Sequence, residues 1–202
     1  MLQVLDSMGA FALAVGHYLQ GKPFSLSSGE INRARVAVQH RLVSLPPDNE
    51  VIIEPSILSL SELNIYECVR LTALIFGVAV VHPIPNPHNV LVELVRRLKI
   101  SIVGLDKEIG NFAMELSGVL LWMMVLGGIA SSDKPERPWF VSQLALIVRK
   151  LRLMDWGGVE DILESFLWLE SACGKGGQEL WDETIASSYI VPLRVSTVHA
   201  ED

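Results

Sequence analysis

The chain has 202 residues, of which half are hydrophobic and 19% are charged, and its formal net charge is −7. This composition excludes a disordered chain, a collagen-like fibre and a protein that coats nucleic acid. It leaves a densely packed helical domain or a membrane protein. The charge is uneven, because residues 154–202 carry ten acidic and two basic side chains while the rest is nearly balanced. Without a clustered positive surface, we expect no specific DNA binding by this chain alone.

The sequence contains few features that indicate a cellular compartment. Cys68 and Cys173 are too few for a disulfide framework, which favours a reducing interior. The apolar stretch Met1–Val15 contains Asp6 and no Lys or Arg, so we expect no signal peptide.

Two apolar runs test the membrane alternative. Leu71–Val81 is shorter than the roughly 20 residues that a spanning helix needs. Leu116–Ala130 is marginal in length and contains three glycines. We therefore expect both runs to be buried helices of a protein that does not enter a membrane.

The first half of the chain has apolar residues at helical spacing. One helix is predicted from Met1 to about Leu19, ending at Gly21 and Pro23. After a Ser/Gly-rich turn, a second apolar stripe runs from Ile31 to Leu45 and stops at Pro46. Its polar face holds Arg33, Gln39 and His40.

The middle of the chain combines a long apolar run with prolines. Val51–Ile53 is a candidate short extended piece, and Ser61 is expected to cap a helix that continues through Val81. The segment His82–His88 has proline at every second position, so it predicts a non-helical linker. A subdivision of the domain would fall here.

The second half continues the helical pattern. Four longer helices are predicted at Leu91–Ile102, at about Asn111–Ile129 with a break at Gly127-Gly128, at Phe140–Leu151 after Pro135 and Pro138, and at Val159–Leu167. A turn at Gly174–Gly177 is expected to close the last of these. A short helix over residues 178–183 and a tail over 184–202 follow.

These patterns predict an all-α fold. No alternating strand pattern persists, so we expect an array of about eight helices with short loops and a Pro-rich mid-chain linker. We expect residues 1–202 to form a single helical domain.

Motifs that carry catalysis are weak. Ser131–Lys134 fits S-x-x-K, but its polar composition favours a turn between helices. Gly174–Gly177 lacks the preceding strand and the following Ser or Thr of a phosphate-binding loop, so we interpret it as a helix-to-helix turn. We expect no catalytic residue and no cofactor.

Metal-ligating and acid–base residues are equally sparse. Of the five histidines, His82 and His88 are close in sequence, but their spacing matches no zinc pattern, and the others are His17, His40 and His199. Glu160, Asp161 and Glu164 share the polar face of a predicted helix, which favours a solvated surface over a carboxylate pair. We expect no metal site.

The tryptophans are more informative. All five lie in the second half, about one per helix: Trp122, Trp139, Trp156, Trp168 and Trp181. Large aromatic side chains distributed in this way staple neighbouring helices together. Core packing is therefore favoured over a ligand cage.

Ordered blocks around these tryptophans resemble a known family. The blocks are LLWMMVLGGIA at Leu120–Ala130, ERPWFV at Glu136–Val141, FLWLESAC at Phe166–Cys173 and ELWDE at Glu179–Glu183. Together they resemble the C-terminal part of the fungal-specific transcription factor domain, the regulatory region downstream of zinc binuclear clusters. The resemblance is clearest over residues 116–183.

The resemblance implies an all-helical domain that regulates transcription in a fungal nucleus. Such regions modulate activation, contact proteins of the transcription machinery and, in some members, sense small molecules. The family's DNA-binding module needs six closely spaced cysteines for two zinc ions, whereas this sequence has two distant ones. We therefore expect the regulatory region without its zinc-cluster module, as a fragment, a truncated paralogue or a gene model that lacks its start.

Three hypotheses follow from these observations. The first is a non-enzymatic regulatory region of a fungal transcription factor. The second is a helical bundle that binds a hydrophobic metabolite in an internal cavity. The third is a dimerisation or interaction module whose exposed apolar face is covered by a partner, including a second copy of the chain. No binding residue is assigned by the sequence.

Overall fold

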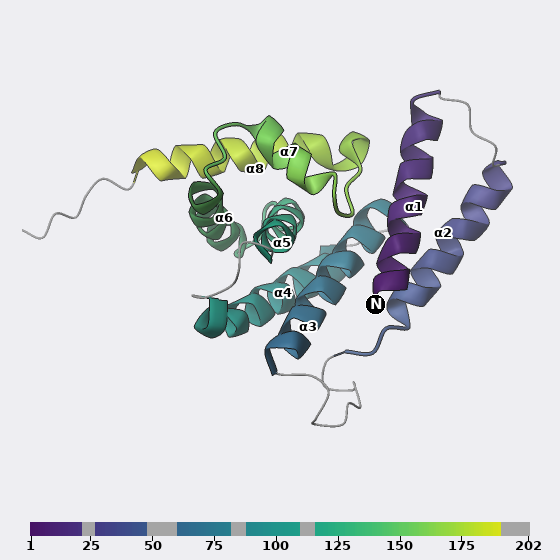
Figure 1. Ribbon diagram of the computed structural model, residues 1–202, viewed down its shortest axis with the longest axis horizontal. Coiled ribbons are helices and arrows are strands. Elements are labelled where there is room, and N and C mark those ends of the chain that lie inside the picture. The colour runs from purple at the N-terminus through teal and green to yellow at the C-terminus, as the bar shows by residue number, and fades with distance from the viewer. Residues whose placement is uncertain (22–26, 48–59, 82–87, 110–115, 191–202) are drawn as a thin grey trace, which may run out of the picture.

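The computed structural model describes residues 1–21, 27–47, 60–81, 88–109 and 116–190. In these ranges the chain forms α-helices and one π-helical segment and no strand, which confirms the predicted all-α array (Figure 1). The elements in chain order are α1 (Leu2–Leu19), α2 (Ser28–Val43), α3 (Leu60–Phe76), η2 (Gly77–Val81), α4 (His88–Ile109), α5 (Ser117–Ala130), α6 (Arg137–Leu151), α7 (Trp156–Leu163) and α8 (Glu170–Ile190).

Local capping chemistry fixes several helix ends. Ser27 caps α2 through a capping box, in which its hydroxyl accepts from the Glu30 N–H and the Glu30 carboxylate accepts from the Ser27 N–H. The Asp155 carboxylate caps α7 by accepting from the Gly158 N–H at 2.9 Å. Arg152 ends α6 in the left-handed conformation. These contacts stop each helix where the chain must turn.

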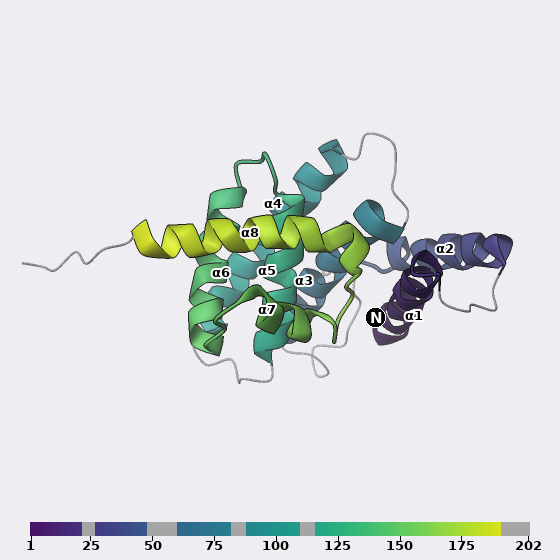
Figure 2. The ribbon, with the colours of Figure 1, turned by 90° about the horizontal axis from the view of Figure 1, so that it is seen from above.

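α5 lies at the centre of a body formed with α6, α7 and α8 (Figures 1 and 2). The predicted break at Gly127-Gly128 is wrong, because α5 continues to Ala130. A Cβ on Gly127 would overlap the Phe140 ring, and one on Gly128 would overlap the buried Leu180 side chain. The two glycines therefore let α6 and α8 approach the α5 backbone, and this packing outweighs their poor helix propensity of about 1 kcal/mol each.

α8 is a single long helix, whereas the sequence predicted a turn, a short helix and a tail. Gly174–Gly177 lie inside α8, and residues 184–190 are its last turns. A Cβ on Gly177 would overlap the Trp156 ring, and one on Gly176 would lie 3.0 Å from Ile129 Cγ2. These glycines are contact surfaces for α7 and α5 and not a turn. Correspondingly, α7 ends at Leu163, four residues earlier than predicted.

α3 and α4 pack side by side and form the layer that α5 covers. The window Asn64–Val81, which joins α3 to η2, is long and apolar enough to cross a membrane by length and composition, and 61% of it is buried in the fold. The helix is longer than the run Leu71–Val81 because it includes more polar residues at its start. A buried core helix has these same properties.

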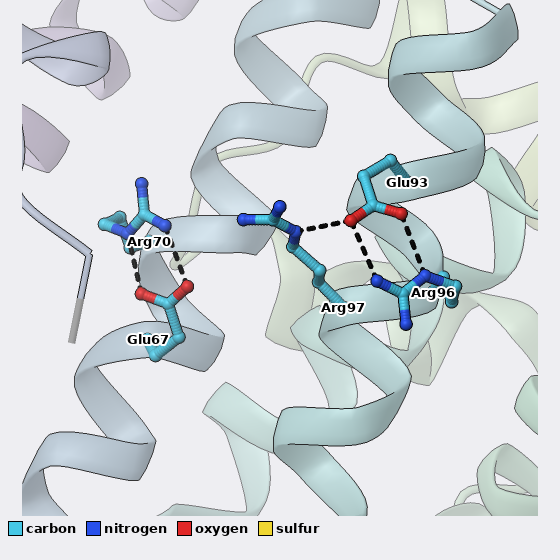
Figure 3. Close-up of polar contacts among 5 residues, drawn as sticks. All are labelled: Glu67, Arg70, Glu93, Arg96 and Arg97. Atoms are coloured by element: carbon cyan, nitrogen blue, oxygen red, sulfur yellow. Dashed lines mark hydrogen bonds and ion pairs between the residues drawn. The ribbon is translucent and has the colours of Figure 1, made fainter. Parts of the chain in front are cut away.

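The ion pair on α3 is buried, whereas the ion pairs on α4 are exposed at the surface (Figure 3). On α3, the Arg70 guanidinium and the Glu67 carboxylate form a two-bond ion pair at 2.7 and 2.8 Å, with both side chains 8% exposed. On α4, the Glu93 carboxylate accepts from both Arg96 and Arg97 at the surface, and these hydrogen bonds lower its pKa to about 2. The paired charge lets α3 be buried along most of its length.

α1 and α2 form an antiparallel hairpin at one end of the molecule (Figure 2). α2 of the hairpin packs on α3 and η2, and a Cβ on Gly77 would lie 2.7 Å from Leu42 Cδ2. The Tyr66 hydroxyl donates to the Pro46 carbonyl oxygen at 2.7 Å, which ties α3 to the end of the hairpin. Buried apolar residues of all eight α-helices belong to one core cluster.

Some predicted boundaries differ from the structure or lie outside it. Leu60 is already helical, so Ser61 lies within the first turn of α3 and not at its N-cap. His88, which the sequence placed in the non-helical linker, is the first residue of α4. The predictions for 51–53, 82–87, 111–115 and 191–202 fall outside the described residues.

Candidate functional site

The S-x-x-K match forms the predicted polar turn between α5 and α6. The Ser131 hydroxyl is buried and donates to the Gly128 carbonyl oxygen at 2.7 Å. The Lys134 ammonium donates to the Ser132 carbonyl oxygen at 3.2 Å, and burial lowers its pKa. Both side chains therefore satisfy carbonyl groups of the turn.

The histidines and cysteines lie apart. His17, His40 and His88 are exposed on three different helices, and His82 and His199 lie outside the described residues. Across the described ranges, no group of three or more His, Cys, Asp or Glu side chains has the proximity to hold a metal ion. Both cysteines are buried, and burial raises the pKa of the Cys173 thiol to about 11.

The acidic face of α7 is only partly the solvated surface that the sequence predicted. Asp161 and Glu164 are exposed, but Glu160 is half-buried. Burial raises the pKa of the Glu160 carboxyl, and a hydrogen bond with the Glu170 carboxyl raises it further. Glu170 reaches this position because α8 begins there and packs near α7, a long-range contact that the periodicity of α7 does not encode.

The tryptophans pack between helices, as predicted. The Trp122 N–H donates to the Leu167 carbonyl oxygen at 3.0 Å, and its ring stacks on Phe166 with centroids 5.9 Å apart. Trp156 and Trp168 contact each other with centroids 6.1 Å apart. Thus Trp122 joins two of the family-like blocks, Leu120–Ala130 and Phe166–Cys173, in the α5–α8 body.

The best candidate for a binding site is a groove of about 930 Å³ between α1 and this body, which we call the α1 groove. One wall is α1, with Leu5, Gly9 and Leu13, and the other is α3, with Ile65 and Val69. Trp122 and Phe166 form part of its floor. Its volume lies within the range of about 300–1,000 Å³ that is typical of small-molecule sites.

The groove is apolar at its base and acidic at its edge. Asp6 and Glu164 are exposed charged residues of its lining, and the described lining residues include no Lys, Arg or His. Leu2 and Leu13 project from α1 with exposed fractions of 76% and 67%. Such a surface is complementary to an apolar partner that carries positive charge.

Two glycines lie where α1 approaches the connection between α7 and α8. A Cβ on Gly9 would lie 3.8 Å from Leu167 Cδ2, and one on Gly16 would lie 3.5 Å from Leu169 Cδ1. Both glycines are on one face of α1, two helical turns apart. α1 therefore contacts the α7–α8 connection along a narrow seam, and the groove lies beside this seam.

No residue of this groove is predicted by the sequence patterns to bind a partner. One signal was available: α1 contains a single Asp and no Lys or Arg, and its apolar residues surround the helix. A helix that is apolar all round needs contacts on more than one face. α2 covers one face, and the other is the wall of the groove.

Comparison of the chain with protein-family models, with curated proteins and with solved structures finds no match. The class of protein that the fold defines is therefore an all-α helical array. The resemblance to the fungal-specific transcription factor domain rests on the four sequence blocks and remains a prediction.

Proposed function

We propose that this chain is a non-enzymatic regulatory region of a fungal transcription factor that acts by binding a protein partner in the α1 groove. The observation that carries the proposal is the groove itself, whose floor includes Trp122, Phe166 and Leu167. These three residues belong to two of the family-like blocks, so the residues that support the resemblance are also residues that a bound partner would touch.

The groove indicates the chemistry of the partner. Along α1 it extends from Met1 to Leu13, about three helical turns or roughly 18 Å. This length suits the apolar face of an amphipathic helix, which binds through side chains at positions i, i+3, i+4 and i+7. Asp6 and Glu164 at the edge favour a helix flanked by Lys or Arg.

A reporter assay in a fungal host tests the proposal. The full chain is fused to a heterologous DNA-binding module, and reporter output is compared for the unmodified chain, Leu13→Lys and Val36→Lys. Leu13 lines the groove, whereas Val36 is similarly exposed on α2 outside it. We expect the fusion to change output relative to the module alone, and Leu13→Lys but not Val36→Lys to abolish that change.

Two results would contradict the proposal. Output equal to that of the DNA-binding module alone would remove the regulatory role, and equal behaviour of the two variants would remove the groove. Sedimentation of the purified chain separates the dimer alternative: a dimer that Leu13→Lys converts to a monomer would mean that a second copy, and not another protein, occupies the groove.

A further inference from the structure

A second cavity lies on the other side of α1, between the α1–α2 hairpin and the π-helical segment η2. Its volume is about 430 Å³, and we call it the Arg35 pocket. Its apolar lining includes Phe11, Val15, Phe76 and Val80. Among the described lining residues, Arg35 is the only charged one, so an apolar chamber contains one cation and no anion.

The Arg35 guanidinium is incompletely paired. Its Nη2 donates to the Asn32 Oδ1 at 2.7 Å, one turn earlier on α2. Its Nε is buried and has no hydrogen-bond partner among the described residues. A buried donor without a partner is unfavourable, and more so when the group is charged, which favours an anionic partner for the Arg35 guanidinium.

The wall opposite Arg35 is irregular. η2 spans Gly77–Val81 and continues α3 in π-helical geometry. Gln39, one turn beyond Arg35 on α2, was expected on the polar face of this helix but lies against Gly77. Its Oε1 is also buried without a partner in the described part of the chain. The unpaired Gln39 Oε1 thus adjoins η2, and Arg35 lines the same pocket as Val80 and Val81 of η2.

We propose that the Arg35 pocket binds a free anionic amphiphile, in which a carboxylate or similar head group pairs with Arg35 and an apolar chain occupies the space between Phe11, Val15, Phe76 and Val80. A charge-assisted hydrogen bond to the guanidinium is about twice as strong as a neutral one. The apolar lining accounts for the chain of the ligand, and the Arg35 guanidinium, the one charged group among the described lining residues, accounts for its head. The site is separate from the α1 groove and does not depend on the function proposed there.

Calorimetric titration of the purified full chain with decanoate, below its micelle concentration, tests the pocket. Decanol and decyltrimethylammonium have the same chain with a neutral and a cationic head, and acetate has the head alone. We expect saturable binding of one decanoate per chain, at least about tenfold weaker binding of decanol, and none of acetate or the cation.

Matched variants connect this binding to the pocket. Arg35→Gln should weaken decanoate binding at least about tenfold, while Arg33→Gln, an exposed arginine on the same helix, should not. Val15→Phe should fill the apolar part of the pocket and block decanoate binding. This variant therefore tests the pocket even if Arg35→Gln fails to fold. Leu13→Lys in the α1 groove should leave decanoate binding unchanged, which separates this proposal from the preceding one.

Three outcomes would overturn this proposal. Equal decanoate affinity in the unmodified chain and in a folded Arg35→Gln, or decanol binding as tight as decanoate, would overturn the proposal. A second experiment measures whether vesicles of phosphatidylcholine and phosphatidylserine retain the chain. If vesicles retain the chain through Arg35 while free decanoate does not bind, the anion is a bilayer head group and the free-amphiphile assignment is wrong.

Discussion

The α5–α8 body and the α1–α2 hairpin are both helical but differ in how closely large side chains pack on their glycines. In the body, glycines receive large side chains from neighbouring helices, as at Gly127 with Phe140 and Gly128 with Leu180. In the hairpin, Gly9 and Gly16 meet only the ends of two leucines at ordinary contact distances, and cavities lie on both sides of α1. Close packing of helices on glycines therefore characterises the body, while α1 of the hairpin borders both binding spaces.

The largest expected effect is the loss of a body aromatic. Trp122→Ala removes a buried ring, its stacking on Phe166 and its hydrogen bond to Leu167, and we expect it to lower the free energy of unfolding by about 3–5 kcal/mol. The hairpin control is Tyr18→Ala, 56% exposed, with an expected loss of about 0.5 kcal/mol. Urea unfolding measures both changes in the free energy of unfolding. Equal decreases for the two variants would contradict the difference in packing between the two regions.

A glycine substitution in the body comes next. Gly128→Ala places a methyl group on the position of the buried Leu180 side chain, so this side chain or the two helices must shift. We expect a loss of about 1–3 kcal/mol in spite of the better helix propensity of alanine. Thermal unfolding provides the measurement, and an unchanged Tm would show that Leu180 adapts and that this packing is loose.

The ion pair between α6 and α8 makes the stability of the body depend on pH. The Arg137 guanidinium donates to both oxygens of Glu183 at 2.9 and 3.0 Å and lowers the pKa of this carboxyl, while its Nη1 donates to the Gly128 carbonyl oxygen. Because Glu183 is half exposed, we expect Arg137→Gln to lose only about 1 kcal/mol at neutral pH.

The sign of the pH effect follows from the direction of the shift. A carboxyl whose pKa is lowered by folding contributes stability above its unfolded pKa of 4.5, and this contribution is lost as the pH falls through the folded pKa. The difference between the unmodified chain and Arg137→Gln should therefore shrink below about pH 4. Urea unfolding across this range checks it, and Glu183→Gln should show the same convergence. A difference that is constant with pH would assign the effect to Gly128 alone.

The smallest effect, of opposite sign, belongs to the hairpin. Gly16→Ala adds a Cβ 3.5 Å from Leu169 Cδ1, which is an ordinary contact, in the interior of α1. We expect it to stabilise the chain by up to about 1 kcal/mol through helix propensity. A higher Tm for Gly16→Ala and a lower Tm for Gly128→Ala would support the difference in packing between the hairpin and the body. A lower Tm for Gly16→Ala would contradict it.

Much of the fold could be predicted from local signals. The periodicity of apolar residues gave the α-helices, and prolines located the end of α2 and the start of α6. The polar composition of Ser131–Lys134 identified a turn. These predictions succeeded because each depends on residues within a few positions of one another.

Predictions that depended on distant residues failed. Gly174–Gly177 has the local composition of a turn, yet it is helical because Trp156 and Ile129 occupy the space that its missing side chains leave. Gln39 has the position of a surface residue, yet it is directed at Gly77. The two binding spaces were not predictable either, since each is lined by helices that are far apart in the sequence.

The sequence by itself determined that this chain is helical, where most of its helices lie and which aromatic residues join them, because helix periodicity and proline geometry are local properties. Only the tertiary structure decided that its glycines are helix contacts, that α1 lies between two cavities and that Arg35 has an unpaired buried donor. The physical reason is one of magnitude: a glycine changes helix propensity by about 1 kcal/mol, whereas the packing that surrounds it contributes several.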